Sequence, residues 1–206
     1  MRWFLVVALL GPLSGTAVAQ PELVERLKQV QSDPVARKSA IESGKKASFF
    51  CANCHGETGV SKSQDVPNLA GQNPDYLLEQ IRKFATGERK DQFMQGLIKL
   101  LSDDERLQIA LFYSNATVVP ATADPTSLVQ GKAIFEKLCV RCHGPQARGD
   151  ALVPRLAGQK RTYLATSITR YRDNTGVRNN QLMSIATSTL KTEEISAIAN
   201  YLSQLP

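Results

Sequence analysis

The sequence predicts an all-α protein made of two tandem domains of the same fold. Three observations support this prediction. Apolar residues recur at the three-to-four-residue spacing of amphipathic helices, and no segment alternates convincingly between apolar and polar residues. The second half of the 206-residue chain repeats the motifs of the first half in the same order, about 88 residues later. A repeat of this length is too long for a solenoid unit and is typical of a duplicated domain.

The chain begins with the features of a secretory signal peptide. Arg2 precedes an apolar run over residues 3–10, and Ala17-Val18-Ala19 offers a small-residue cleavage site. We expect cleavage after Ala19, which leaves residues 1–19 as the signal peptide, and export to the periplasm. A retained N-terminal anchor is the alternative, but the run is shorter than the ~20 apolar residues that a membrane-spanning helix needs.

Residues 20–120 are expected to form the first domain. A helix over residues 21–31 has apolar residues at helical spacing and ends before Pro34. The helix that precedes Cys51 contains Gly44, and a glycine in a helix costs about 1 kcal/mol relative to alanine. We therefore expect Gly44 to permit a close crossing with another helix.

Two later helices complete the first domain. Asn73 is predicted to cap a helix that begins at Pro74. Ser102 and Glu105 form the pattern of a capping box for the last helix of the domain. The apolar residues expected on the inner face of the helix after Asn73 are Leu77, Leu78, Ile81 and Phe84.

Residues 121–206 are expected to form the second domain. A linker over residues 114–126, with two prolines and small polar residues, separates the copies. Gly131 repeats the helix glycine of the first domain, Thr162 is predicted to start the middle helix, and Thr192 is predicted to cap the last helix. The apolar face of that last helix is expected to contain Ile195, Ile198, Ala199 and Leu202.

Each domain contains one Cys-x-x-Cys-His sequence, which is the attachment signature of c-type haem. The two thiols of such a motif can form thioethers with the two vinyl groups of one porphyrin, and the histidine that follows can then coordinate the iron. Together the two motifs use every cysteine and every histidine of the chain. We therefore predict two covalently bound haems c. The predicted haem anchors are Cys51, Cys54, Cys139 and Cys142, and the predicted iron ligands are His55 and His143.

Other uses of paired cysteines fit the sequence less well. Exported proteins often contain disulfides, and a Cys-x-x-Cys pair can also be a redox dithiol. The histidine directly after each pair argues against both uses. Zinc binding by the two pairs is a further alternative, but it leaves the position of the histidines and of the methionines unexplained.

Two methionines stand at matching places in the two copies. Met94 follows His55 at almost the same spacing at which Met183 follows His143, in each case before the last helix. A methionine is usually a flexible core residue, but unrelated core residues would not be expected at matched positions. We predict His55/Met94 and His143/Met183 as axial ligand pairs. A neutral thioether favours ferrous iron, so such a pair raises the reduction potential.

A proline follows each of these histidines at a similar spacing. Pro67 comes after His55, and Pro154 comes after His143, with nearly equal separations along the chain. A ligand histidine usually donates its second ring N–H to a carbonyl or carboxylate group. A backbone carbonyl near each proline is therefore the candidate acceptor, and a simple turn is the alternative role for the prolines.

The order of these motifs resembles that of the class I cytochrome c domain. Two such domains behind a periplasmic signal peptide, with Val-Pro-x-Leu-Ala-Gly-Gln in each half, resemble the dihaem cytochrome c4 family. The resemblance covers roughly residues 39–206 and leaves residues 21–38 outside it. It implies the same axial pairs, with the carbonyl groups of Pro67 and Pro154 behind the histidines. It also implies that the domains face each other, with haem propionates near the interface and electrons passing between the haems.

Charge is distributed unevenly between the two copies. Residues 20–123 contain 13 Lys/Arg and 13 Asp/Glu, whereas residues 124–206 contain 11 Lys/Arg and 6 Asp/Glu. A basic second domain would steer the protein toward an acidic partner surface, and ordinary solubility charge is the alternative. The basic residues are scattered and aromatic residues do not interleave with them, which argues against nucleic acid as a partner.

The function that these features favour is a periplasmic dihaem electron carrier and not an enzyme. Its expected redox partners are a quinol-oxidising complex and a terminal oxidase or reductase, and peripheral association with the membrane is compatible with this role. A dihaem redox enzyme, such as a peroxidase or thiosulfate dehydrogenase, is an alternative that needs an open or unusual sixth iron position. A haem-bearing subunit of a larger respiratory complex is another.

Overall fold

The computed structural model describes residues 20–122 and 124–206. The predicted signal peptide and its cleavage site after Ala19 lie outside the described residues. Over the described residues the chain forms helices and no strand, which confirms the predicted all-α fold.

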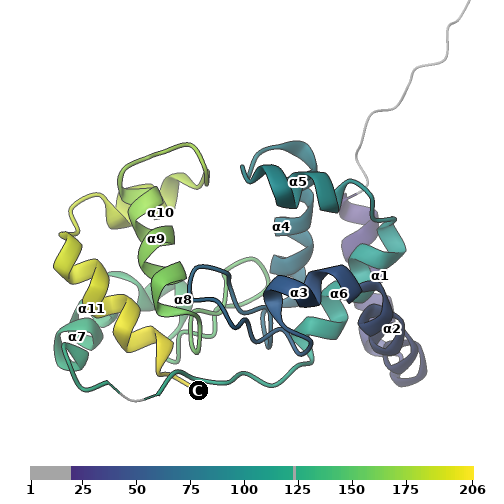
Figure 1. Ribbon diagram of the computed structural model, residues 1–206, viewed down its shortest axis with the longest axis horizontal. Helices are drawn as coiled ribbons and strands as arrows, with labels where there is room; N and C mark the ends of the chain where they lie inside the picture. Colours follow the sequence, from purple (N-terminus) through teal and green to yellow (C-terminus); the bar gives the residue numbers. More distant parts are fainter. Residues whose placement is uncertain (1–19, 123) are drawn as a thin grey trace, which may run out of the picture.

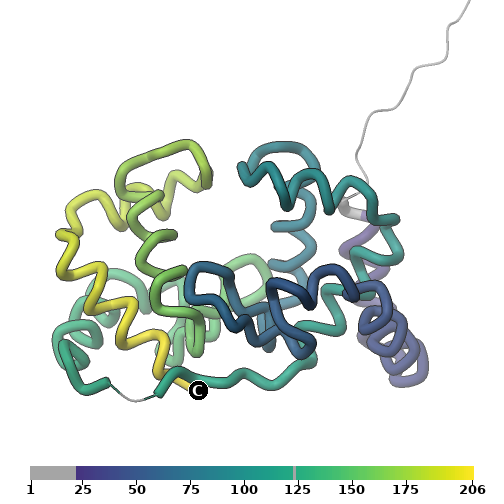
Figure 2. The backbone as a smooth tube through the Cα atoms, in the orientation of Figure 1, coloured from purple at the N-terminus to yellow at the C-terminus, as the bar shows by residue number. Residues whose placement is uncertain are grey.

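Two helical lobes lie side by side, joined by an extended segment along one edge of the molecule (Figure 1). The first lobe contains α1 (Gln20–Ser32), α2 (Pro34–Ala47), α3 (Phe49–His55), α4 (Pro74–Thr86), α5 (Gln92–Ile98) and α6 (Asp103–Ser114). The second lobe contains α7 (Leu128–Leu138), α8 (Val140–His143), α9 (Arg161–Arg172), α10 (Gln181–Thr187) and α11 (Thr192–Ser203). The backbone trace in Figure 2 shows the loops that follow α3 and α8 approaching each other between the lobes.

Each lobe is built on a close crossing between the helix before the cysteines and the last helix. A Cβ atom on Gly44 of α2 would lie 2.0 Å from the carbonyl oxygen of Gln108 in α6. A Cβ atom on Gly131 of α7 would lie 2.1 Å from the carbonyl oxygen of Ala197 in α11. Only glycine allows the two backbones to approach this closely, so the predicted role of both glycines is confirmed.

The predicted inner faces form the two cores. Leu77, Leu78 and Phe84 of α4 are buried, and Ile81 is half-buried. In the second lobe the buried residues of α11 include Ile195, Ile198, Ala199 and Leu202. The N-terminal helix α1 belongs to the first core, because Leu27 is fully buried against it.

Of the three predicted helix caps, one is confirmed, one lies at the predicted position without a side-chain hydrogen bond, and one is wrong. The Ser102 hydroxyl accepts the N–H of Glu105, and the Glu105 carboxylate accepts the N–H of Ser102. By contrast, Thr192 is the first residue of α11, and the N–H of the preceding Lys191 donates to Glu194 at 2.8 Å. The cap therefore lies one residue before the predicted position, and the Glu194 carboxylate accepts the backbone N–H there.

The predicted cap at Asn73 has a different function in the structure. Its side chain makes no capping hydrogen bond with α4. The amide instead donates to three carbonyl oxygens of the second lobe, those of Arg148 at 3.2 Å, Asp150 at 2.5 Å and Val153 at 2.9 Å. Pro74 does begin α4 as predicted. The helix α9 begins at Arg161, one residue before Thr162.

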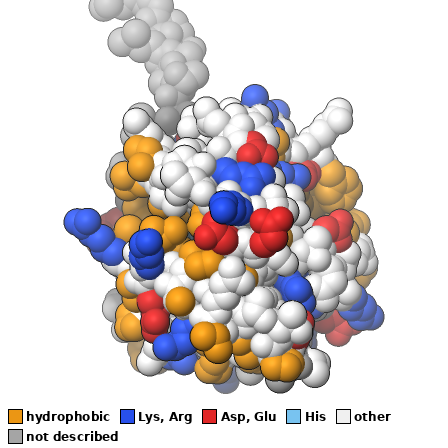
Figure 3. Space-filling view, turned by 90° about the vertical axis from the view of Figure 1, so that its left-hand side faces the viewer, with side chains coloured by type: hydrophobic (Ala, Val, Ile, Leu, Met, Phe, Trp, Pro, Cys, Tyr) orange, Lys and Arg blue, Asp and Glu red, His pale blue; other side chains and the backbone are white. Residues whose placement is uncertain are grey.

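The outer face of the second lobe is mixed in charge. Figure 3 shows Lys and Arg side chains interspersed with Asp, Glu and apolar side chains on this face. The excess of basic residues counted in the sequence therefore does not gather into one patch on this side. No helix in the described part of the chain is long and apolar enough to span a lipid bilayer.

Candidate functional site

The first Cys-x-x-Cys-His motif lies on α3, and the second begins one residue before α8. Each helix ends at the histidine, so the two thiols and the imidazole follow one another within about one helical turn. All four thiols are free; Cys54 and Cys142 are exposed, whereas Cys51 and Cys139 are half-buried. In each motif both thiols are therefore available for a covalent bond.

Both histidines are buried, with 7 % of His55 and 4 % of His143 exposed. The Nδ1 atom of His55 lies 2.9 Å from the carbonyl oxygen of Pro67, and Nδ1 of His143 lies 3.1 Å from that of Pro154. The predicted hydrogen bonds are thus present in both domains. Burial lowers the pKa of both imidazoles, which favours the neutral ring. With Nδ1–H donating to the carbonyl, the lone pair of Nε2 remains available to a metal.

The two methionines have matching positions in two matching short helices. Met94 is the third residue of α5, and Met183 is the third residue of α10. The backbone N–H of Met94 donates to the side chain of Asp91, and that of Met183 donates to the side chain of Asn180, both at 3.0 Å. Both methionine residues are half-buried. The two caps therefore fix the backbone of each methionine at the same point of its helix.

A cluster of arginine and tyrosine residues lies between the lobes, and the sequence analysis did not find it. Arg178 is 6 % exposed; it donates to the hydroxyl of Tyr163, and its Nε atom has no hydrogen-bond partner. Arg89 donates to the same hydroxyl at 3.1 Å. Each arginine stands five residues before the methionine of its domain, and this matched spacing was the signal that could have identified them.

The arginine cluster fits the carboxylate groups of a porphyrin. Burial alone would raise the pKa of Tyr163, but the charges of Arg178 and Arg89 outweigh it and lower the pKa to about 8. No ion pair with an acidic side chain neutralises either arginine in the part of the chain that the structure describes. A buried, unpaired cation with an orphaned N–H is costly unless an anion accompanies it, and haem propionates are anions of the right kind.

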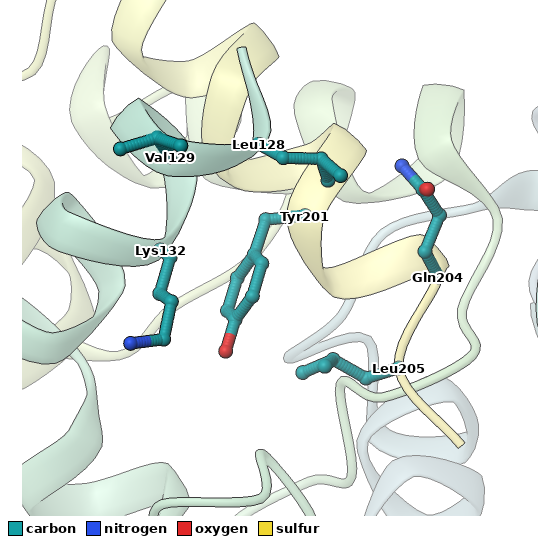
Figure 4. A pocket seen from close by; sticks show the side chains of 6 residues that line it. All are labelled: Leu128, Val129, Lys132, Tyr201, Gln204 and Leu205. Carbon is teal, nitrogen blue, oxygen red and sulfur yellow. The ribbon is translucent and has the colours of Figure 1, made fainter. Parts of the chain in front are cut away.

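One surface hollow is separate from all these groups. It has a volume of about 380 Å³ and lies between α7 and α11 (Figure 4). Its lining residues are Leu128, Val129, Lys132, Tyr201, Gln204 and Leu205. None of them is a predicted haem anchor or iron ligand.

Among the described residues, no three His, Cys, Asp or Glu side chains are grouped so that they could hold a metal ion.

Comparison with known proteins identifies the family. The cytochrome c family model matches residues 128–206. A cytochrome c4 from Pseudomonas aeruginosa is 32 % identical over 175 residues, which cover 79 % of this chain and 87 % of the relative. The chain belongs to the cytochrome c4 family. The crystal structure of reduced cytochrome c4 from Pseudomonas stutzeri matches with a TM-score of 0.74 and 30 % identity, over 80 % of this chain and 98 % of that chain.

Membership of the cytochrome c4 family confirms the predicted cofactors and the predicted kind of function. The protein is a dihaem c-type cytochrome, and the two Cys-x-x-Cys-His motifs account for the two covalent haems. It is an electron-transfer protein. Another relative, a thiosulfate dehydrogenase electron acceptor from Thiomonas intermedia, is 30 % identical over 175 residues, which cover 76 % of this chain and 78 % of the relative.

Proposed function

We propose that this cytochrome c4 carries electrons in the periplasm through two six-coordinate haems, one in each domain. Bound haem supplies one-electron chemistry between ferric and ferrous iron. In this proposal Cys51 and Cys54 anchor the first haem, and Cys139 and Cys142 anchor the second. His55 with Met94, and His143 with Met183, are the axial ligands. Residues 20–120 and 121–206 are the two domains.

The observation that carries the ligand proposal is the matched geometry of the two halves. In each half a buried histidine donates Nδ1–H to a proline carbonyl, and a methionine occupies the third position of a capped short helix. The hydrogen bond fixes the ring of His55 or His143 and leaves Nε2 free. The cap fixes the backbone of Met94 or Met183. A fixed imidazole and a fixed thioether are the groups that a His/Met-ligated haem needs.

The boundary proposal is supported by a backbone hydrogen bond between the linker and the second domain. The N–H of Ala121 donates to the carbonyl oxygen of Ser203 in the last helix, at 2.8 Å. Ala121 is therefore hydrogen-bonded to the last helix of the second domain, which agrees with a boundary at this position.

The ligand proposal is tested by replacing one methionine at a time. Met94→Ala should abolish the weak near-infrared band of sulfur-bound ferric iron for the first haem and lower its reduction potential, because the soft ligand is lost. Met183→Ala is the matched variant and should do the same to the second haem. Each single variant should retain about half of the band. Loss of the whole band in either single variant, or a full band in both, would contradict the assignment.

A carrier, rather than an enzyme, is the function that the proposed ligand sets support. With both axial positions filled by side chains, neither iron offers a position to a substrate. The chain also has no histidine or cysteine beyond those in the two motifs. The ferric spectrum tests this proposal, because a high-spin haem at neutral pH would indicate an open position and favour a redox enzyme.

We propose that the electron donor is a quinol-oxidising complex and that the electron acceptor is a terminal oxidase or reductase. The excess of basic residues after residue 123 suits docking on an acidic partner surface. Attraction of this kind weakens as salt screens the charges, so stopped-flow reduction by the partner should slow as ionic strength rises. A flat salt response would remove electrostatic steering from the proposal.

A further inference from the structure

Two glutamine side chains cross between the domains in the same way. Gln159 accepts the backbone N–H of Asn68 at 2.7 Å and donates to the carbonyl oxygen of the same residue at 2.9 Å. Gln72 accepts the N–H of Arg155 at 2.8 Å and donates to its carbonyl oxygen at 3.0 Å. Both glutamines are buried, with 6–7 % exposed. Each amide therefore binds both backbone groups of one residue in the opposite domain.

The residue that each glutamine binds directly follows the proline behind a histidine. The carbonyl of Pro67 and the N–H of Asn68 belong to one peptide group. That carbonyl oxygen lies 2.9 Å from Nδ1 of His55, and that N–H donates to Gln159. A single peptide group thus joins the histidine of the first domain to a glutamine of the second.

The reciprocal connection is equally short. The carbonyl of Pro154 lies 3.1 Å from Nδ1 of His143, and the N–H of the same peptide group, on Arg155, donates to Gln72. The first domain therefore reaches the histidine of the second domain by the same route.

We propose that Gln159 and Gln72 are positioning residues that tune the haem of the opposite domain through these two peptide groups. Hydrogen bonds in a chain polarise one another. An acceptor on the peptide N–H makes the carbonyl oxygen more negative, which strengthens its hydrogen bond with Nδ1–H of the histidine. A histidine with a stronger acceptor is more basic and donates more charge to the iron. Domain docking thereby favours ferric iron and lowers both reduction potentials.

Each glutamine is also fixed in its own domain. The Oε1 atom of Gln159 accepts the N–H of Lys160 at 2.9 Å, and that of Gln72 accepts the N–H of Asn73 at 3.0 Å. Each amide oxygen therefore accepts one N–H from its own domain and one from the opposite domain. This arrangement keeps the peptide group of the opposite domain in one orientation. Since the histidine ring follows that carbonyl, the glutamine also sets the ring orientation in the opposite domain.

The test uses the protein with both haems attached and measures the reduction potential of each haem separately. Paramagnetic NMR resolves the two haems by their methyl resonances during a redox titration. Gln159→Met, which removes both hydrogen bonds to Asn68, should raise the potential of the first haem more than that of the second. Gln72→Met should show the opposite preference. The expected size is up to about a tenfold change in the redox equilibrium constant, which is 59 mV for one electron.

A matched control separates tuning from simple loosening of the interface. Asn73→Ala removes the hydrogen bonds to the carbonyls of Arg148, Asp150 and Val153 but leaves the two peptide groups and both glutamines intact. It should shift both potentials little. Loosening alone would instead give the same pattern in Asn73→Ala and in the glutamine variants, with no preference for the opposite haem, and that pattern would overturn the proposal.

A second substitution reverses the sign and covers the case in which Gln159→Met does not fold. Gln159→Glu loses the donor to the carbonyl of Asn68 but retains and strengthens the acceptor for its N–H. The potential of the first haem should therefore fall, and fall more than that of the second. Asn68 also keeps its own amide bond to the carbonyl of Gly158, at 2.9 Å, which holds the interface together at this point. No shift, equal shifts, or a larger shift in the domain that carries the substitution would each overturn the proposal.

The inference rests on the proposed roles of His55 and His143 as iron ligands, and the two can fail separately. If the unaltered protein shows histidine and methionine ligation at both haems while the glutamine variants leave both potentials unchanged, only the tuning proposal is wrong. If the unaltered protein lacks that ligation, the proposed function itself is wrong.

Discussion

Gly44→Ala tests the helix crossing on which the first domain is built. The added Cβ atom would lie 2.0 Å from the carbonyl oxygen of Gln108, 2.5 Å from its carbonyl carbon and 2.9 Å from Cβ of Phe112. Ordinary contact begins at 3.4 Å, so α2 and α6 would have to move apart until all three separations reach that distance. The obstructing atoms are mainly backbone, which cannot rotate away as a side chain can.

The size of the effect follows from two opposing contributions. Overpacking of a rigid contact costs about 1–3 kcal/mol or more, whereas alanine gains about 1 kcal/mol over glycine in a helix. Because the obstructing atoms are backbone, we expect a net loss near the upper end of this difference, up to about 2 kcal/mol in the first domain, which corresponds to a fall in Tm of up to roughly 10 °C for a domain of this size. Thermal unfolding of the holoprotein, followed by haem absorbance, should show the first domain unfolding earlier and the second unchanged.

Two other glycines provide the controls for this experiment. Gly131→Ala places a Cβ atom 2.1 Å from the carbonyl oxygen of Ala197 and should transfer the loss to the second domain. Gly96, inside α5, has no atom within 4 Å of an added Cβ. Gly96→Ala should therefore stabilise the first domain by up to about 1 kcal/mol. If Gly44→Ala stabilised the protein as Gly96→Ala does, the close crossing of α2 and α6 would be wrong.

Two further predictions concern helix caps. Asp91→Ala and Asn180→Ala each remove the acceptor of a methionine backbone N–H and should weaken the end of a short helix by about 1 kcal/mol. The near-infrared band of the corresponding haem should then disappear at a lower temperature; an unchanged midpoint would show that these caps do not support the methionines. Ser102→Ala breaks the capping box of α6 and should lower the free energy of unfolding by about 1 kcal/mol in denaturant titrations, without changing either haem spectrum. A change in either spectrum would contradict this separation of stability from the sites.

Local patterns predicted most of the helices and the groups proposed to hold iron. Helical periodicity found the inner face of α11, and the capping box at Ser102 is present as predicted. The cysteine motifs and the matched methionines depend on spacing along the chain, and spacing can be read directly. The hydrogen bond from His55 to Pro67 also follows from spacing, because the loop that contains the proline returns to the helix that carries the histidine.

The interface between the domains could not be predicted in this way. Asn73 carries the pattern of a helix cap, yet carbonyl groups of the second domain are its acceptors. Local and distant acceptors compete for the same amide, and the sequence near Asn73 describes only the local ones. The meeting of Arg89 with Arg178 around Tyr163 likewise requires the two domains to be docked.

Duplication explains why the same seven-residue motif serves both inside a domain and between domains. When two copies of one fold dock face to face, a residue of the first copy meets a given position of the second, and the equivalent residue meets the equivalent position in return. Gln72 and Gln159 obey this rule, since each binds the residue after the other copy's proline. The role of each glutamine therefore cannot be predicted from the sequence of one cytochrome c domain, because its partner lies in the other domain.

The symmetry of this exchange is not complete. On the first side the bound residue is Asn68, whose own amide donates to Gly158 and accepts the N–H of Ser61. On the second side it is Arg155, a cation whose Nε donates to the carbonyl of Ala157. A nearby cation disfavours ferric iron, whereas a neutral amide does not, so the two peptide groups present different fields to otherwise equivalent histidines. If the proposed ligands are the same in both domains, we therefore expect the second haem to have the higher potential, because the residue after the proline behind its histidine is a cation.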